Sequence, residues 1–222
     1  MTDSPGRIRV INPNSNDAVT RGLDAALAPL RFENGPEIVC STLPEGPFGI
    51  ESQADADSVV MPLVRLIEAD NASDAFVIAC YSDPGLHACR EGTQRPVFGI
   101  AECGVLTALA RADRFGVIAI GQRSMARHAR YLRQMGLVSR LAGERPLNMS
   151  VAETASGERT LERMVELGRE LKECDGAAAI VMGCAGMARH RRPLEEALGI
   201  PVIDPTQAAV AMAIATVQLA RH

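Results

Sequence analysis

The sequence predicts an α/β protein built from two pseudo-symmetric lobes, each a mostly parallel sheet flanked by helices, with the active-site cleft between the lobes. Three observations lead to this prediction. Short runs rich in β-branched residues alternate with longer amphipathic stretches along the chain. Three segments of the first half return in the second half, in the same order and each about 105 residues later. Two cysteines, Cys80 and Cys184, occupy equivalent places in one repeated segment.

The first half of the chain alternates between expected strands and expected helices. The strands are expected at 7–12, 37–43, 75–80 and 96–101. The helices are expected at 17–30, 52–70 and 84–92, with Pro62 as a kink or a first-turn residue.

The second half repeats this scheme. The segment "RFGVIAIG" (114–121) resembles 7–14, "AAAIVMGCAGM" (177–187) matches the stretch around Cys80, and "IPVIDPTQA" (200–208) matches 95–103. The last helix has clear start signals, because Asp204 can cap it, Pro205 suits the first helical position and Gln207 sits near the capping-box place. We expect this helix to return to the first lobe. The predicted lobes are therefore 1–101 with 206–222, and 102–205.

Composition excludes several classes of function. The 222 residues carry a net charge of −4 and only 3% aromatic side chains, which argues against binding of nucleic acid or of an anionic membrane. No apolar stretch approaches the roughly 20 residues of a membrane-spanning helix. The N-terminus shows no signal-peptide pattern, so we expect a cytoplasmic protein with free thiols.

Cys80 and Cys184 each end an apolar run, at the edge of a parallel sheet where ligands usually bind. Each is followed closely by an expected helix start, which lowers the pKa of a thiol. An ordinary thiol costs roughly 2 kcal/mol to ionise at pH 7, so this help is substantial. Across one cleft, a thiolate and a thiol could invert an acidic C–H centre by removing a proton from one face and adding one to the other. A buried structural thiol is the common alternative, and we assign it to Cys40, Cys89, Cys103 and Cys174.

Five segments together resemble the aspartate/glutamate/hydantoin racemase superfamily, and most closely its hydantoin racemase branch. They are "RVINPNSN", "IACYSDPGL", "PVFGIAE", "MGCAGMA" and "GIPVID", in family order over nearly the whole chain. The resemblance implies a two-lobed fold and cofactor-independent proton transfer by Cys80 and Cys184.

The chain departs from the family pattern beside both cysteines. Tyr81-Ser82 stands where the hydantoin branch commonly has Phe-Gly, and Ala185 stands where amino-acid racemases usually have Thr. Because few hydroxyls are present to hold an α-carboxylate, we expect a neutral ring amide such as a 5-substituted hydantoin or allantoin. The expected substrate-binding residues are Asn14, Phe48, Tyr81, Ser82, Gln122, Ala185 and Gly186.

Several polar residues allow simpler interpretations. Asn14 also fits a plain Asn-Pro turn, and Asp83 reads best as a helix N-cap ahead of Pro84. The run 189–192 reads as a solvated helix face. His87 has no zinc-type spacing to other ligands, and neither a P-loop nor a dinucleotide fingerprint occurs, so we expect no metal and no cofactor.

Three alternatives stay open. One is another reaction on the same scaffold, such as amino-acid racemisation, cis–trans isomerisation of an unsaturated diacid or decarboxylation of a malonate. The others are a thiol redox protein and a non-catalytic binder of small molecules. The expected partners are a small-molecule substrate and other copies of the chain in a homo-oligomer, with no nucleic acid and no membrane.

Overall fold

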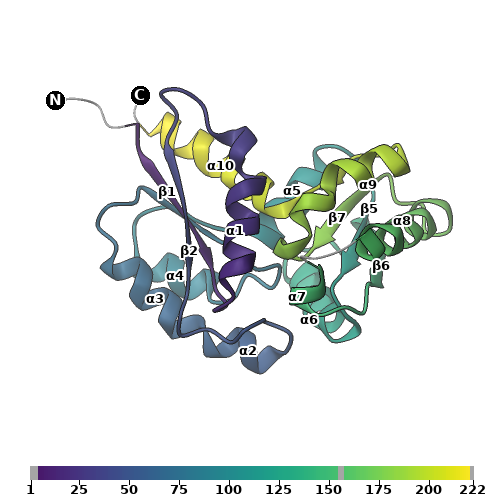
Figure 1. Cartoon of the computed structure of the whole chain (residues 1–222), viewed down its shortest axis with the longest axis horizontal. Helices are drawn as coiled ribbons and strands as arrows, with labels where there is room; N and C mark the ends of the chain where they lie inside the picture. The colour runs from purple at the N-terminus through teal and green to yellow at the C-terminus, as the bar shows by residue number, and fades with distance from the viewer. Residues whose placement is uncertain (1–4, 155–157, 221–222) are drawn as a thin grey trace.

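The computed structural model describes residues 5–154 and 158–220, which form two α/β lobes side by side (Figure 1). Each lobe contains a parallel sheet, with strand order β2-β1-β3-β4 in the first and β6-β5-β7-β8 in the second. The same order in both lobes confirms the predicted pseudo-symmetric fold. The strands are β1 Arg7–Asn12, β2 Glu37–Thr42, β3 Ala75–Ile78, β4 Val97–Gly99, β5 Phe115–Ala119, β6 Leu141–Pro146, β7 Ala179–Gly183 and β8 Val202–Ile203.

The helices of the first lobe follow the predicted order but are shorter. The segment 17–30 breaks at Leu27, ahead of Pro29, and 52–70 breaks at Val59. Pro62 lies in the first turn of the second piece, where its missing N–H leaves no hydrogen bond unmade. The helices are α1 Asp17–Ala26, the 3₁₀ turn η1 Ala28–Leu30, α2 Gln53–Ser58, α3 Val60–Ala69 and α4 Leu86–Gly92.

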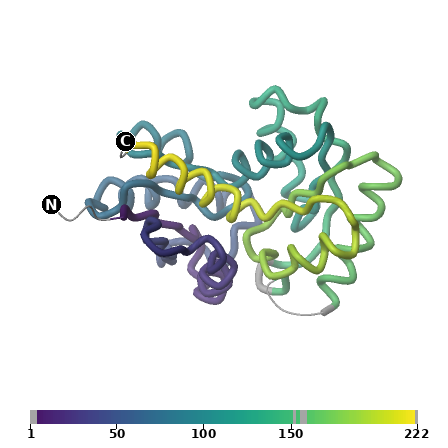
Figure 2. The backbone as a smooth tube through the Cα atoms, turned by 90° about the horizontal axis from the view of Figure 1, so that it is seen from above, coloured from purple at the N-terminus to yellow at the C-terminus, as the bar shows by residue number. Residues whose placement is uncertain are grey.

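The last helix, α10 (Pro205–Leu219), leaves the second lobe and runs back along the first (Figure 2). It packs against β1, β3 and α5, which confirms the predicted return. Asp204 caps it as predicted, by accepting from the N–H groups of Thr206 and Gln207 at 2.8 and 3.0 Å. The Gln207 side chain does not complete a capping box; it donates to the Ala26 carbonyl at 2.7 Å and so ties α10 to α1.

The other helices surround the second sheet and the junction between the lobes. They are α5 Ile100–Leu109, α6 Gln122–Gln134, η2 Val138–Arg140, α7 Val151–Thr154, α8 Glu158–Glu173, η3 Ala185–His190 and α9 Arg191–Leu198. One buried apolar cluster includes side chains of β1, α1, α5, β5, β7 and α10, so the two lobes share a core. A smaller cluster lies under α2, α3 and α4 on the other face of the first sheet. We keep the division into 1–101 with 206–222, and 102–205, as a proposal about folding units.

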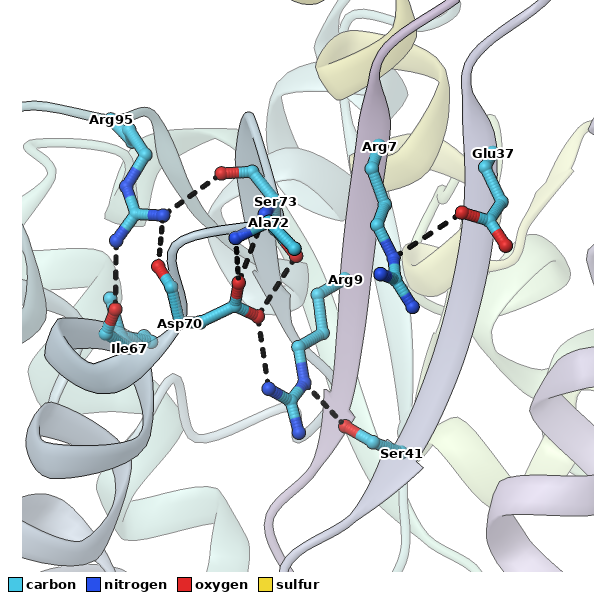
Figure 3. A network of polar contacts seen from close by, with 9 residues as sticks. All are labelled: Arg7, Arg9, Glu37, Ser41, Ile67, Asp70, Ala72, Ser73 and Arg95. Carbon is cyan, nitrogen blue, oxygen red and sulfur yellow. Dashed lines mark hydrogen bonds and ion pairs between the residues drawn. The ribbon is translucent and has the colours of Figure 1, made fainter. Parts of the chain in front are cut away.

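A polar network fixes the end of β3 that lies away from the cysteine (Figure 3). The Asp70 carboxylate accepts from Arg9 at 2.9 Å and from the N–H groups of Ala72 and Ser73 at 2.8 and 2.9 Å. Arg95 donates to the carbonyls of Asp70 and Ser73. Burial of Asp70 opposes ionisation, but these donors outweigh it and lower the pKa of the carboxyl to about 2. The network anchors the loop before β3 without entering the cavity described below.

Candidate active site

Cys80 and Cys184 lie just beyond the ends of β3 and β7 and line the same cavity. The structure therefore brings together the two residues that the sequence singled out. The empty space in the cavity, together with its open mouth, is about 440 Å³. Its wall consists of Asn14, Val19, Ile50, Ala79, Cys80, Tyr81, Ser82, Ile120, Ser124, Arg127, His128, Gly183, Cys184, Ala185 and Gly186.

Each thiol accepts a hydrogen bond from the backbone two residues further along. The N–H of Ser82 bonds to the Cys80 sulfur, and the N–H of Gly186 bonds to the Cys184 sulfur at 3.4 Å. Cys184 is the N-cap of η3, as expected for a thiol at a helix start. Cys80 is followed instead by a turn, and α4 begins only after Gly85, whose φ of 68° lies in the left-handed region. The helix expected at 84–92 is present but begins at Leu86, two residues later than expected, so a turn separates it from Cys80.

Burial dominates the acidity of both thiols. It raises the pKa of Cys80 to about 12, against the opposing effects of the Ser82 N–H and the Arg127 cation. It also raises the pKa of Cys184, although the Gly186 N–H and the Thr154 side chain act in the other direction. The expectation that helix starts lower these values is thus wrong for the ligand-free protein, because removal from water outweighs the backbone donors.

Asp83 caps a different helix from the one expected. Its carboxylate accepts from the N–H groups of Ala101 and Glu102, both at 2.9 Å, and so caps α5 rather than α4. Burial raises the pKa of Asp83 to about 7, against these N–H donors and a hydrogen bond from Tyr131 of α6. The N–H of Asp83 also donates to the Cys80 carbonyl at 2.9 Å. The loop that carries the first thiol is thereby joined to α5 and to the second lobe.

The two lobes achieve this cap in different ways. In the second lobe Asp204 stands directly before α10, but the equivalent position before α5 is Gly99. A methyl group at Gly99 would stand 2.3 Å from Cγ of Asp83. The missing side chain therefore leaves the space that Asp83 fills. Because Asp83 caps α5 from this space, the chain is helical from Ile100, and the strand expected at 96–101 ends at Gly99.

Five of the seven expected substrate-binding residues line the cavity, namely Asn14, Tyr81, Ser82, Ala185 and Gly186. Asn14 is 6% exposed, and its carbonyl oxygen accepts from the side chain of Asn12 and the N–H of Asn16 at 2.9 and 3.0 Å. Because these donors occupy its oxygen, the amide NH₂ is the part of Asn14 suited to donate to a ligand.

Phe48 and Gln122 lie outside the cavity wall. The Phe48 side chain is 65% exposed, and the loop that carries it presents Ile50 to the cavity instead. Gln122 is the exposed first residue of α6, and that helix faces the cavity one turn later. Sequence position alone identified the correct loops but not the side chains that point inward.

Arg127 and His128 of α6 line the cavity and were not predicted. The His128 ring stands 2.5 Å, Nδ1 to Oε1, from Glu144 of β6, and both side chains are only 5% exposed. Its ring also meets Tyr81 edge-on, with centroids 4.9 Å apart. In the sequence, 122–134 is strongly polar and contains four arginines, which is typical of a solvated surface helix. This pattern gave no indication that Arg127 and His128 line a cavity.

A second, more polar cavity adjoins the first and shares Tyr81, Ser82, Arg127 and His128 with it. His87 lines this second cavity. Within the described ranges, no three His, Cys, Asp or Glu side chains are grouped as metal ligands. All six cysteines fall within those ranges and are free thiols. Cys174 is exposed, so the buried structural role expected for it is wrong. None of the described helices is long and apolar enough to cross a membrane.

Two equivalent sheets with a shared cavity between their strand ends place the chain among the two-lobed α/β racemases. A family model described as Asp/Glu/Hydantoin racemase matches residues 8–213. The chain therefore belongs to the Asp/Glu/hydantoin racemase family, a family of isomerases, and the resemblance inferred from the sequence is confirmed.

Individual relatives agree with this assignment over nearly the full chain. The hydantoin racemase of Paenarthrobacter aurescens is 37% identical over 217 residues, which cover 96% of this chain and 92% of the relative. The allantoin racemase from Klebsiella pneumoniae has a TM-score of 0.90 at 35% identity, covering 97% and 89% of the two chains. An allantoin racemase from Pseudomonas fluorescens has a TM-score of 0.91 at 26% identity, covering 96% and 92%.

Proposed function

We propose that this protein racemises a 5-substituted hydantoin or allantoin by proton transfer between its two thiols, without a cofactor. The observation that carries the proposal is that Cys80 and Cys184, contributed by equivalent strands of the two lobes, line one cavity. The names of the relatives support the substrate class, since one is a hydantoin racemase and two are allantoin racemases.

The reaction begins when one cysteine, as thiolate, removes the proton from the carbon next to the ring carbonyl. The other cysteine, as thiol, then donates its proton to the opposite face of the carbanion. The first cysteine ends as a thiol and the second as a thiolate, so charge and protons balance. The two thiols exchange roles for the other enantiomer.

Forming the thiolate takes up a large part of the barrier. At pH 7, ionising a thiol with a pKa of about 12 costs about 7 kcal/mol. A turnover of about 10 per second corresponds to a barrier of about 16 kcal/mol, so roughly 9 kcal/mol is left for breaking the C–H bond. The high cost also counts against the thiol-redox alternative, because sensor cysteines have a low pKa and good access to solvent.

Donors around the cavity suit a ring amide. The Asn14 amide NH₂ can donate to a ring carbonyl and stabilise the negative charge that develops there. Beside Cys184 the wall is formed by Ala185 and Gly186, which offer no hydroxyl for the carboxylate of a free amino acid. Ser82, Ser124 and Arg127 of the same wall can also hold a carboxylate, so the choice of a hydantoin ring over an amino acid rests on the names of the relatives.

The second cavity gives the substituent on the ring a place to lie. It begins at Tyr81 and Ser82 of the first cavity. Its wall includes polar side chains from α2 and α6, namely Gln53, Asp57, Arg130 and Gln134. Gln53 donates to Asp57 at 2.8 Å and accepts from Arg130 at 2.6 Å. A ureido group, as in allantoin, can form hydrogen bonds with the remaining donors and acceptors of this polar wall, whereas a benzyl group cannot. We infer that polar substituents are preferred.

Proton NMR in D₂O tests the proposal directly. The panel contains allantoin, 5-methylhydantoin, 5-benzylhydantoin and L-glutamate, each with the metal-free enzyme and with a heat-denatured control. The expected result is loss of the ring C–H signal and of optical rotation for the hydantoins only. Exchange at glutamate alone, or at no member of the panel, would contradict the proposed substrate class. The cytoplasmic location and the homo-oligomer expected from the sequence stay predictions.

A further inference from the structure

His128 is a buried histidine at the junction of the two cavities, and the proton transfer proposed above does not use it. It lies on α6, and its side chain is only 5% exposed. Four residues line both cavities, namely Tyr81, Ser82, Arg127 and His128. The His128 ring is therefore part of the wall where one cavity opens into the other.

Two contacts fix the orientation of this ring. Its Nδ1 stands 2.5 Å from Oε1 of Glu144, a buried side chain of β6, the strand against which α6 packs. Because a carboxylate only accepts, Nδ1 carries the hydrogen in this contact. On another side the ring meets Tyr81 edge-on, at an interplanar angle of 86° and a centroid distance of 4.9 Å. The imidazole is thus held in place before any ligand binds, so little side-chain entropy is lost on binding.

The second ring nitrogen, Nε2, faces the cavity space. Among the described residues, no protein group is hydrogen-bonded to it, and it is not one of the fully buried polar atoms that lack a partner. It is therefore open to a ligand. With the hydrogen on Nδ1, Nε2 of the neutral ring has a lone pair and accepts a hydrogen bond.

Other polar groups of the first cavity are donors or already have partners. Arg127 offers only donors, and the Asn14 amide presents its NH₂ because its oxygen is occupied. The carbonyls of Cys80 and Cys184 accept from backbone N–H groups at 2.9 and 3.2 Å. The Ser124 hydroxyl can accept as well, but it lines the first cavity alone.

At the junction itself, Nε2 is the side-chain group that can only accept. The hydroxyls of Tyr81 and Ser82 carry a hydrogen of their own and can take either role. A ligand that brings an N–H group to the junction therefore finds its matching partner in His128.

A hydantoin bound as proposed brings such a group. Its ring lies in the first cavity and its substituent in the second, so the stereocentre lies at the junction. Ring nitrogen N1, which carries a hydrogen, is bonded directly to the stereocentre. The other ring nitrogen, N3, lies between the two carbonyls and is further away.

We propose that Nε2 of His128 accepts a hydrogen bond from the N1–H group of the hydantoin ring, and that Glu144 is the positioning residue that keeps the hydrogen of the imidazole on Nδ1. This inference rests on the proposed function for the placement of the ring. It makes His128 a specificity-determining residue: the site selects rings with an N–H beside the stereocentre and rejects hydantoins that are alkylated at N1.

Ligand binding tests the proposal without reference to turnover. Dissociation constants are measured by NMR titration for 5-methylhydantoin, 1,5-dimethylhydantoin and 3,5-dimethylhydantoin. The proteins are wild type and a double variant, His128→Phe with Glu144→Leu. Both partners are replaced because removal of one would leave the other buried and unpaired. The matched control is Arg133→Gln, an exposed position of the same helix outside both cavities.

The expected result is a loss that depends on N1. Wild type should bind 5-methylhydantoin about tenfold or more tighter than 1,5-dimethylhydantoin. The double variant should bind 5-methylhydantoin and 3,5-dimethylhydantoin about tenfold more weakly than wild type, and 1,5-dimethylhydantoin less than about threefold more weakly. Arg133→Gln should match wild type for all three ligands. An equal loss for all three ligands in the double variant would show a merely structural role and overturn the proposal.

The state of the imidazole gives a second readout, which decides the question even if the double variant does not fold. Circular dichroism checks the fold, and ¹⁵N NMR of histidine-labelled wild type reports which ring nitrogen carries the hydrogen. We expect the Nδ1–H form of His128, with an Nε2 resonance that moves when 5-methylhydantoin is added and stays when 1,5-dimethylhydantoin is added. An imidazolium in the complex, or an Nε2 resonance that 5-methylhydantoin leaves unmoved, would overturn the proposal.

Failure of this inference and failure of the proposed function give different results. If the hydantoins bind in the expected order but exchange no ring C–H in D₂O, the proposed function is wrong and the role of His128 holds. If they exchange but their binding does not depend on N1, only the role of His128 is wrong. Absence of binding by all three hydantoins would overturn both.

Discussion

A methyl group added at Gly99 would stand 2.3 Å from Cγ of Asp83 and 2.4 and 2.6 Å from its carboxylate oxygens. Carbon atoms in contact lie about 3.5–4.0 Å apart, so in Gly99→Ala the carboxylate must move by about 1 Å. This movement breaks its hydrogen bonds to the N–H groups of Ala101 and Glu102. Loss of a cap costs about 0.5–2 kcal/mol and overpacking about 1–3 kcal/mol, so we expect a destabilisation of about 2–4 kcal/mol.

For a chain of this size that loss corresponds to a fall in Tm of roughly 4–16 °C, measured by circular dichroism. Racemisation should fall as well, because the Asp83 N–H supports the loop that carries Cys80. The control is Gly121→Ala, since an added methyl there meets no atom within 4 Å. Asp83→Gly with Gly99→Asp copies the arrangement of the second lobe and should be more stable than Gly99→Ala. A Gly99→Ala protein that melts within about 1 °C of wild type would refute this account of the cap.

Three further predictions follow from burial and charge. Brief iodoacetamide treatment of the ligand-free protein should label the exposed Cys174 at least about tenfold faster than Cys80 or Cys184, because burial keeps both cavity thiols protonated. Peptide mapping measures the three labelling rates. Faster labelling of Cys80 or Cys184 than of Cys174 would contradict the raised pKa values. The folded-state pKa of Asp70 lies near 2, below its ordinary value of 3.8, so the ionised carboxylate contributes about 2 kcal/mol of stability above about pH 4, and this is lost as the pH falls towards 2. In Asp70→Asn, the free energy of unfolding measured with urea should therefore change less between pH 4 and pH 2 than in wild type. An equal loss of stability over this pH range in both proteins would exclude this role of Asp70. Finally, kcat/KM for allantoin should exceed that for 5-benzylhydantoin by about tenfold or more; the reverse order would show that the substituent does not lie in the polar cavity.

The sequence predicted the sheet architecture well because its signals are local. Buried parallel strands are apolar runs, and the repeat at about 105 residues showed that the two lobes are equivalent. The positions of Cys80 and Cys184 followed from the same pattern, since strand ends in the two lobes must face one cavity if the lobes pack together. The Asp204 cap was also visible, because a capping side chain and its helix are adjacent in the sequence.

What the sequence could not show depends on distant partners. Asp83 caps a helix that begins 17 residues later, and nothing near Asp83 indicates that Gly99 leaves room for its carboxylate. Arg127 lies on a helix whose composition is typical of a surface, so its inward direction depends on how the lobes pack. The pKa of Cys80 is set by burial, which a local helix signal does not report. Phe48 failed as a cavity residue for a related reason, since an aromatic side chain in a loop can point either way.

The central claim is that each thiol serves one face of the substrate, and solvent exchange in single-cysteine variants tests it most directly. Cys80→Ser and Cys184→Ser are incubated in D₂O with each enantiomer of the hydantoin that the wild type racemises fastest, and the ring C–H signal and the optical rotation are followed together. Both variants should lose racemisation, because a hydroxyl is a far weaker base than a thiolate. Each should still exchange the proton of one enantiomer with retention of configuration, and the two variants should choose opposite enantiomers. Cys89→Ser is the matched control, because Cys89 is buried away from the cavity, and it should racemise within a few-fold of wild type. Near-wild-type racemisation by either Cys80→Ser or Cys184→Ser, or exchange of the same enantiomer by both, would contradict the two-thiol mechanism.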